Sequence, residues 1–300
     1  MLPAVDLTLF LPFLEQRQII LTPGKRLARD ITRSWGAQQP SNQSAVITPR
    51  VEAVDGWLES IWSECIELGH LPSLRLLSHQ QELVLWQQII KEDIAESDGF
   101  SLMHPRAAAS RAKIARDRLL LFQAERLEGL WNYFQFDEDC SVFARWAQRF
   151  EQRLLQLDAT TRYNTYQQLL SISGFKKEAV GLYAAPKLAP LPQRVLEHLC
   201  QVTVIEPPCC QQEEMVAVGF PSREDELAAA AEWAFQNSQQ EHSRTAIVLL
   251  DLEADRDQLE YRLREQFDCL DAQYNDLPVN FSTGMPLGTT PMYRDLLLAL

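Results

Sequence analysis

The sequence predicts an α/β protein built on a parallel sheet, with a large all-helical block inserted into it and the start of a second α/β unit after it. Three observations lead to this prediction. An apolar run at residues 18–21 is followed by a turn and a helical pattern. No strand pattern occurs between about residues 76 and 170. Strand-like runs then return at 179–183 and 202–205.

The composition is that of a globular protein, and its charge limits how it can bind nucleic acid. The 300 residues are 46% hydrophobic and 23% charged, which suits one large domain or two ordinary ones. The formal net charge of -13 argues against broad neutralisation of phosphates, because that mode of binding needs clustered Lys and Arg. Any contact with DNA must be local, unless a basic partner or a segment outside this sequence supplies the positive charge.

The cysteines and histidines predict no metal site. Cysteines occur at positions 65, 140, 200, 209, 210 and 269 without a CxxC pair, and the five histidines lack the spacing of metal ligands. We expect six reduced thiols, and favour this over a strained disulfide between the adjacent Cys209 and Cys210. The N-terminus lacks the basic region and cleavage site of a signal peptide, and no apolar stretch reaches the ~18 residues of a membrane span. We expect a cytoplasmic protein without a membrane partner.

The first two units of the chain each predict a strand, a turn and a helix. The apolar run at 18–21 leads through a Thr-Pro-Gly-Lys turn into a helical pattern at 26–35. A second strand is expected at 44–47, and it leads through Thr48 and Pro49 into a helix with an apolar face at 54–62. The two units are similar in type but not in sequence.

The middle of the chain predicts only helices. Apolar residues follow helical periods at 83–90, 107–130 and 143–157. The basic residues of this block are expected on the solvent side of the period, and they are Arg111, Lys113, Arg116, Arg118 and Arg126. Six tryptophans of the chain fall at helical core spacing, so packing is expected for Trp57, Trp62, Trp86, Trp131, Trp146 and Trp233.

After the helical block, the sheet resumes and a second unit begins. The predicted elements are strands at 179–183, 202–205 and 245–250 and helices at 191–200, 223–237, 253–267 and from 291 onward. Acidic residues at 224–226 are read as a first helical turn favoured by the helix dipole. The sequence stops at Leu300 inside an amphipathic helical pattern without a C-cap, so we expect it to be the N-terminal part of a longer protein.

The first strand and turn can be compared with a P-loop, which needs glycines to cradle phosphates, a Lys for the β- and γ-phosphates and a Ser or Thr for Mg²⁺. Placing Gly24 and Lys25 on the GK of that motif puts Ile19 at the first Gly and Arg26 at the hydroxyl position. Two essential parts are therefore replaced. A basic loop that caps a helix is the favoured interpretation.

Four segments carry a family resemblance. They are 20–29, which reads as an apolar strand, a Thr-Pro turn and Arg-Leu-Ala-Arg; 76–82 with the apolar pairs at 85–86 and 89–90; 143–146; and 279–287, with its Asn-Phe-Ser-Thr-Gly-Met-Pro-Leu. In this order they resemble the front of a superfamily 1 helicase, and more narrowly the inactivated helicase-like part of AddB/RecB-type bacterial DNA-repair nucleases. The resemblance implies a first RecA-like (P-loop NTPase-like) domain from 1–70 and 171–222, a helical insertion at 71–170, and a truncated second RecA-like domain at 223–300.

The resemblance also locates a Walker B position, where active RecB-like motors have a strand ending in Asp-Glu and a Gln a few residues later. Aligning the strand at 180–183 with it places Ala184 and Ala185 at the acidic pair and Gln193 at the trailing Gln. Without the acids no carboxylate holds Mg²⁺ and none polarises the attacking water. The alternative is that the two alanines simply end a buried strand.

The function implied by the resemblance is a non-catalytic DNA-binding or scaffold module of a DNA repair and recombination nuclease, with no ATP hydrolysis, cofactor or metal. A PD-(D/E)xK exonuclease site is expected only beyond this sequence. Implied partners are DNA, as single strands or duplex ends, and a helicase or nuclease subunit. The positions where such motors touch the DNA backbone are Thr48, Arg50, Asn280 and Thr283, and the competing interpretation of each is a neutral turn former.

Two other classes of function stay open. The first is a protein-protein interaction module whose acidic surface docks a basic partner and does not itself bind DNA. The second is an α/β enzyme, which is disfavoured because the sequence offers no Ser/His/Asp, Cys/His or metal constellation.

Overall fold

A computed structural model of the chain describes residues 5–39, 47–96, 104–123, 127–174, 178–183, 187–207, 216–240, 245–272, 277–282 and 290–298. The chain divides into two compact units, Met1–Cys209 and Cys210–Leu300. Helices of the first unit are α1 (Leu11–Glu15), α2 (Lys25–Gln38), α3 (Val54–Glu67), α4 (His79–Glu96), α5 (Pro105–Gln123), α6 (Leu127–Tyr133), the 3₁₀ turn η2 (Phe134–Phe136), α7 (Glu138–Gln156), α8 (Arg162–Leu170) and α9 (Pro190–Leu199). Its strands are β1 (Ile19–Thr22), β2 (Val51–Ala53), β3 (Arg75–Leu76), β4 (Ala159–Thr160), β5 (Glu178–Tyr183) and β6 (Cys200–Ile205), and the second unit has α10 (Arg223–Ser238), α11 (Leu252–Gln266) and α12 (Pro291–Leu298).

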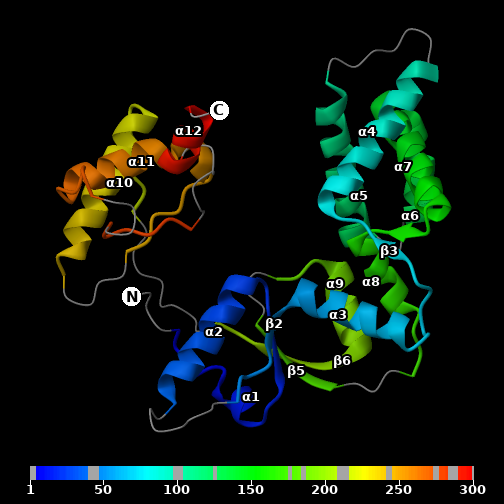
Figure 1. Cartoon of the computed structure of the whole chain (residues 1–300), viewed down its shortest axis with the longest axis horizontal. Helices are drawn as coiled ribbons and strands as arrows, with labels where there is room; N and C mark the ends of the chain where they lie inside the picture. The colour runs from blue at the N-terminus through cyan, green and yellow to red at the C-terminus, as the bar shows by residue number, and fades with distance from the viewer. Residues whose placement is uncertain are drawn as a thin grey trace. The chain divides into compact units, whose positions relative to one another are not determined.

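The first unit contains a four-stranded sheet in the order β2-β1-β5-β6, in which every neighbouring pair is parallel (Figure 1). The predicted mixed α/β class with a parallel sheet is thus confirmed. Strand β1 is fully buried along its length, as expected of a central parallel strand covered on both faces. Residues of β1 alternate between two cores, with Ile19 and Leu21 in one and Ile20 in the other. Helices α3, α8 and α9 cover the first face, and α1 and α2 cover the second.

The second strand differs from its prediction. The strand that pairs with β1 is β2, which follows Pro49, with Leu21 opposite Glu52. The expected strand at 44–47 lies largely outside the described residues, and Ile47, which is described, belongs to no strand. Strand β2 itself was not predicted, because it is only three residues long, too short to show an alternating pattern.

Helices α4, α5 and α7 enclose a separate core in which Trp86 and Phe150 stack with ring centroids 4.4 Å apart. The prediction that this stretch contains only helices misses one feature. The two-residue strands β3 and β4 pair in parallel, Arg75 with Ala159 and Leu76 with Thr160. They were missed because two residues carry no periodicity and because the pairing joins segments that are distant in the sequence.

The second unit packs α10 against α11 around a small core that includes Leu227, Ala231, Leu259 and Leu263. Helix α10 starts at the expected place, where the Ser222 side chain accepts a hydrogen bond from the Asp225 amide and three acidic residues occupy the first turn.

Two predictions for the second unit were wrong. Residues 245–250 form no strand, and among the described residues of this unit no other strand offers them a ladder. Val248 is 88% exposed and Leu250 fully exposed, while Ile247 and Leu249 pack on the core, so the apolar residues alternate between solvent and the helical core without forming a strand. Trp233 was expected in a core but is 52% exposed on α10.

Candidate functional site

The carboxyl edge of the sheet is the first candidate site, because the chain changes direction there. From β1 the chain passes through α2 to β2 on one side, and after the helical block it returns to β5 on the other side of β1. In open α/β sheets, ligands bind outside the carboxyl ends of strands at such a switch point. The loop after β1 is therefore where the fold would place a ligand.

The loop after β1 consists of only Pro23 and Gly24, between the end of β1 and the start of α2. Pro23 has no backbone N–H to offer to a phosphate. The Thr22 hydroxyl donates to the carbonyls of Gly24 (3.0 Å) and of Glu52 (3.2 Å), so this side chain closes the loop onto β2. Ile19, aligned above with the first Gly of a P-loop, is fully buried inside β1. The loop cannot wrap a phosphate as a Walker A loop does.

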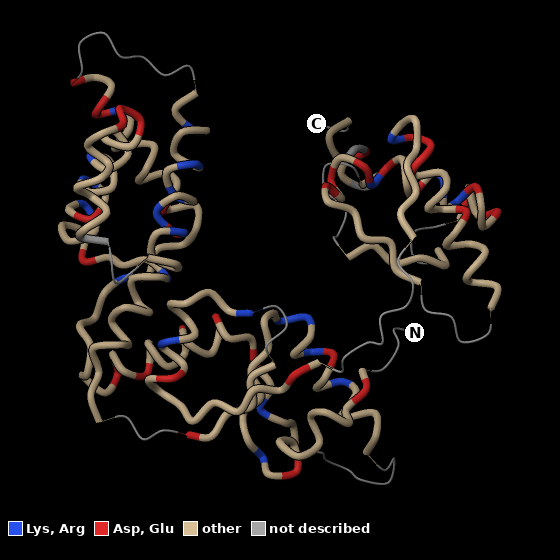
Figure 2. The backbone as a smooth tube through the Cα atoms, turned by 180° about the vertical axis from the view of Figure 1, so that it is seen from behind, with Lys and Arg blue, Asp and Glu red and all other residues tan. Residues whose placement is uncertain are grey.

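Lys25 and Arg26 stand in the first turn of α2, and both are exposed. They begin a row of cations along this helix, visible as blue bands in Figure 2. No acidic residue occupies the first turn, and the N-cap Gly24 contributes no side-chain hydrogen bond. This end of the helix is therefore strongly positive.

The remaining predicted site residues are not gathered at this edge. Ala184 and Ala185, after β5, lie outside the described residues, as does Thr283. Gln193 lies in the first turn of α9, where it is exposed and its amide donates to Glu197 (2.9 Å). Asn280 is exposed in the second unit.

Thr48 and Arg50 are at the opposite edge of the sheet from the Pro23-Gly24 loop. They were expected after a strand, but the strand β2 follows them, and the Ile20 amide donates to the Arg50 carbonyl (2.9 Å). Both residues line a cavity of about 430 Å³ together with Trp35 near the end of α2. Arg50 also pairs with Glu178 (3.0 Å), an exposed contact.

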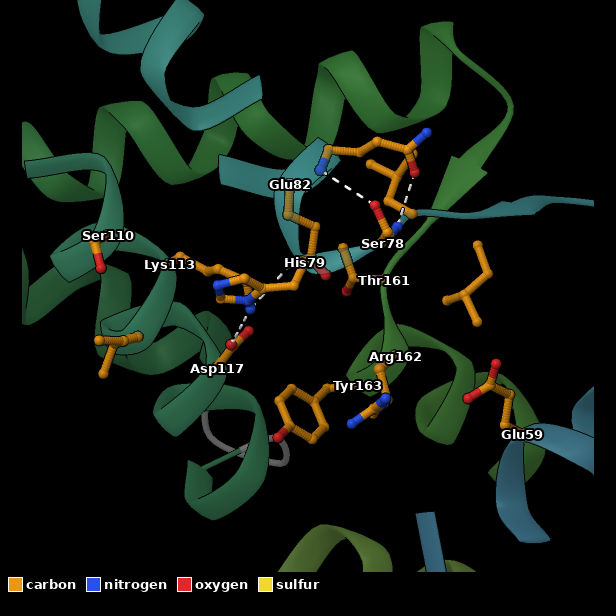
Figure 3. Close-up of a pocket in the computed structure, with 14 residues that line it drawn as sticks. Glu59, Ser78, His79, Glu82, Ser110, Lys113, Asp117, Thr161, Arg162 and Tyr163 are labelled. Carbon is orange, nitrogen blue, oxygen red and sulfur yellow. Dashed lines mark hydrogen bonds and ion pairs between the residues drawn. The ribbon is translucent and has the colours of Figure 1, made fainter. Parts of the chain in front are cut away.

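A second candidate site lies where helices α4, α5 and α8 meet, in a cavity of about 550 Å³ (Figure 3). Lys113 projects from α5 between Glu82 of α4 and Asp117, with its Nζ 3.3 Å from a Glu82 oxygen and 2.6 Å from an Asp117 oxygen. The Glu82 oxygen Oε2 is buried and makes no hydrogen bond of good geometry, despite the nearby ammonium. Arg162 and Tyr163 of α8 line the other side.

Burial shapes the protonation of this cluster. It raises the pKa of Glu82, and Lys113 offsets this only in part. Burial alone would lower the pKa of Lys113, but the hydrogen bond to Asp117 and the charge of Glu82 outweigh it and raise that pKa. The pKa of Tyr163 is raised by burial and then by Asp117 and Asp55. The arrangement is an ammonium shared between two carboxylates, and burial raises the pKa of one of them, Glu82.

The helical period places Lys113 and Arg116 on the solvent side, but the structure buries both, and this prediction was wrong. Arg116 donates to Glu151 (2.6 Å) on α7, to Thr161 (3.2 Å) and to Asn164 (2.8 Å) on α8. Its guanidinium therefore joins the helical block to the helices that cover the sheet. The signal that could have identified it was the absence of an acidic partner for Arg116 one turn away on its own helix.

The other expectations for this block divide. Arg111 and Arg118 are exposed as predicted, and Arg126 lies outside the described residues. The tryptophans at positions 57, 62, 86 and 146 are buried, and Trp131 is partly buried.

No family model matches the sequence, and no curated protein matches it. Among the described residues, no three His, Cys, Asp or Glu side chains form a group that could hold a metal ion. Within the same ranges, no helix is both long and apolar enough to cross a membrane.

Proposed function

We propose that this chain is a helicase-like module that binds DNA, or acts as a scaffold on it, without hydrolysing ATP. The proposal treats residues 1–70 and 171–222 as a degenerate RecA-like domain, 71–170 as its helical insertion and 223–300 as the start of a second one. It places the module in the cytoplasm, within a DNA repair and recombination nuclease of the AddB/RecB kind, beside a helicase or nuclease subunit.

The observation that best supports the proposal is the connection between β1 and α2. Its position at the switch point of a parallel sheet is where a motor of this kind holds nucleotide. Its construction from Pro23 and Gly24 alone leaves too few backbone N–H groups to surround a triphosphate. A sheet that keeps the position of a nucleotide site without a phosphate-binding loop suits a module that binds DNA but does not hydrolyse ATP.

The experiment for the ATPase part is a calorimetric titration of the chain with ATP and Mg²⁺. We expect no binding, and the Lys25→Ala variant should behave as the parent does. Micromolar binding that Lys25→Ala abolishes would overturn this part, because it would show that the short loop does hold phosphates.

The experiment for the DNA part is a gel shift at low salt with single-stranded and forked DNA. We expect a shift with both, and we expect the binding to be weak because the formal net charge of -13 repels the phosphates. Absence of any shift would instead favour an interaction module whose acidic surface docks a basic partner. The two functions are thereby distinguished.

A further inference from the structure

Helix α2 carries the positive side chains that an overall acidic protein would need in order to hold nucleic acid at one place. It has four cations, Lys25, Arg26, Arg29 and Arg33, and one acid, Asp30, in a chain with a formal net charge of -13. All four cations are exposed. Their order at ~100° per residue places them within an arc of about 100° of the helix surface. They form one face, which we call the α2 basic face.

The charges of the α2 basic face are almost uncompensated. Its only ion pair among the described residues is Arg33 with Asp30, at 3.9 Å. Lys25 and Arg26 also stand at the positive end of the helix dipole, where cations are disfavoured and acids favoured. The helices α3, α7, α10 and α11 each have acids in that first turn. An anionic ligand would neutralise both the side chains and the dipole.

The spacing of the α2 basic face suits a repeating anion. Lys25, Arg29 and Arg33 are four residues apart, so they are spaced by ~6 Å along the axis and cover ~12 Å. Such a row matches a chain of phosphates better than a single small anion, because the three side chains follow one another along the helix axis.

The chemistry of the α2 basic face also argues against a protein partner. Protein interfaces need an apolar centre, usually with large aromatic or aliphatic anchors. No large hydrophobic residue of α2, which is described throughout, is exposed. Helix α5 offers the contrast, since its exposed Arg111 and Arg118 are interspersed with Ile114 (48% exposed) and Phe122 (55% exposed).

We propose that the α2 basic face binds the phosphodiester backbone of a nucleic acid, independently of the bases. This rests on the proposed DNA-binding function and gives it a surface that differs from Thr48, Arg50, Asn280 and Thr283. The contacts are charge-charge contacts to phosphate, so affinity depends on salt and not on sequence.

The test compares three variants of the full chain by fluorescence anisotropy with a labelled single strand and a duplex of equal length over a range of salt. The first reverses the face, with Lys25→Glu, Arg29→Glu and Arg33→Glu. The matched control reverses the same number of charges on α5, with Arg106→Glu, Arg111→Glu and Arg118→Glu. The third keeps the charges, with Lys25→Arg, Arg29→Lys and Arg33→Lys. Circular dichroism verifies that each variant is folded.

We expect only the α2 reversal to lose binding. For three phosphate contacts, the logarithm of the binding constant falls against the logarithm of the salt concentration with a slope of about 2 on a single strand and about 3 on a duplex. The α2 reversal should lower the measured slope by that amount. The α5 control and the charge-keeping variant should bind as the parent does.

Unchanged binding of the α2 reversal, or an equal loss in the α5 control, overturns the inference while leaving the proposed DNA-binding function intact. If the face instead binds an acidic protein, DNA binding of the α2 reversal will be unchanged. If the parent chain shows no salt-dependent binding to either DNA, both the inference and the DNA part of the proposed function fail.

Discussion

Replacing Asp93 tests whether a buried carboxylate holds the helical block together. Asp93 lies on α4 with 1% of its surface exposed. It accepts two hydrogen bonds from Arg145 (2.8 Å each) and one from the indole N–H of Trp146 (2.8 Å), both on α7. Nη2 of Arg149 lies 3.5 Å from Oδ1 of Asp93. Removing the carboxylate therefore leaves the buried indole N–H of Trp146 without its acceptor and weakens the contact between α4 and α7.

The size of the loss follows from these contacts. Asp93→Asn keeps an oxygen for Trp146 but loses the charge, and we expect a loss of about 2 kcal/mol, because Arg145 is 45% exposed and can be hydrated instead. Asp93→Ala also leaves the indole unpaired and should cost about 3–4 kcal/mol. Glu96→Gln is the matched control, because Glu96 also pairs with Arg149 but is 62% exposed, and it should cost about 0.5 kcal/mol or less.

The pH dependence has a definite sign. Burial alone would raise the pKa of Asp93, but the hydrogen bonds from Arg145 and Trp146 outweigh it and hold the pKa below its usual value of 3.8. A lowered folded pKa gives stability that is present above pH 3.8 and is lost as the pH falls through the folded value. The difference between the parent and Asp93→Asn should therefore shrink in acid.

The assay is urea unfolding by circular dichroism at neutral pH and at stepwise lower pH. Hydrogen exchange of α4 and α7 amides is measured in parallel, because a chain of two units need not unfold in one step. If Asp93→Ala costs no more than Glu96→Gln, or if the deficit of Asp93→Asn is the same at every pH, the Asp93 carboxylate does not hold α4 to α7 in the way described.

Three further predictions concern the first unit. Arg116→Ala should lower the free energy of unfolding by about 3 kcal/mol, since it unpairs groups on α7 and α8, while the exposed Arg118→Ala should cost about 0.5 kcal/mol or less; urea unfolding of both variants measures the contrast. Gly181→Ala should cost about 1–3 kcal/mol in the same assay, because a Cβ there would lie 2.7 Å from the Phe13 ring, and an unchanged midpoint would contradict the tight packing of β5. The folded pKa of Glu82 is raised above 4.5, so the parent loses stability as the pH rises above 4.5, whereas Glu82→Gln cannot lose a proton. The free energy of unfolding of Glu82→Gln should therefore increase relative to that of the parent over this range. If the two free energies keep a constant difference at every pH, burial does not destabilise the Glu82 charge.

The parts of the fold that the sequence predicts correctly are those with a long local pattern. The β1-α2 connection and the β5, α9 and β6 segments each contain enough apolar residues to show their period and a turn to mark their ends. Residues 245–250 have an equally strong strand pattern, and they fail as a strand because pairing needs a neighbour that no local pattern shows.

The candidate sites were harder to predict, for a related reason. Lys113 and Arg116 look solvated on a helical wheel because their partners, Glu82 and Glu151, are on other helices far along the chain. The turn after β1 was expected at residues 22–25, but Thr22 belongs to β1 and Lys25 to α2, so only Pro23 and Gly24 remain between them. The sequence shows which residues of a P-loop are replaced, but not that the loop is too short to surround a phosphate.

The direction of α2 bears on what kind of ligand the sheet domain can hold. Because α2 joins two parallel strands, it starts at the carboxyl edge beside Gly24 and ends at the amino edge, where Trp35 and Arg50 line one cavity. Its 14 residues span ~21 Å. A nucleotide held at the first edge would not reach Arg50. A polymer lying along α2 would pass the whole basic face and approach both edges, which is what the proposed binding of a nucleic acid strand requires.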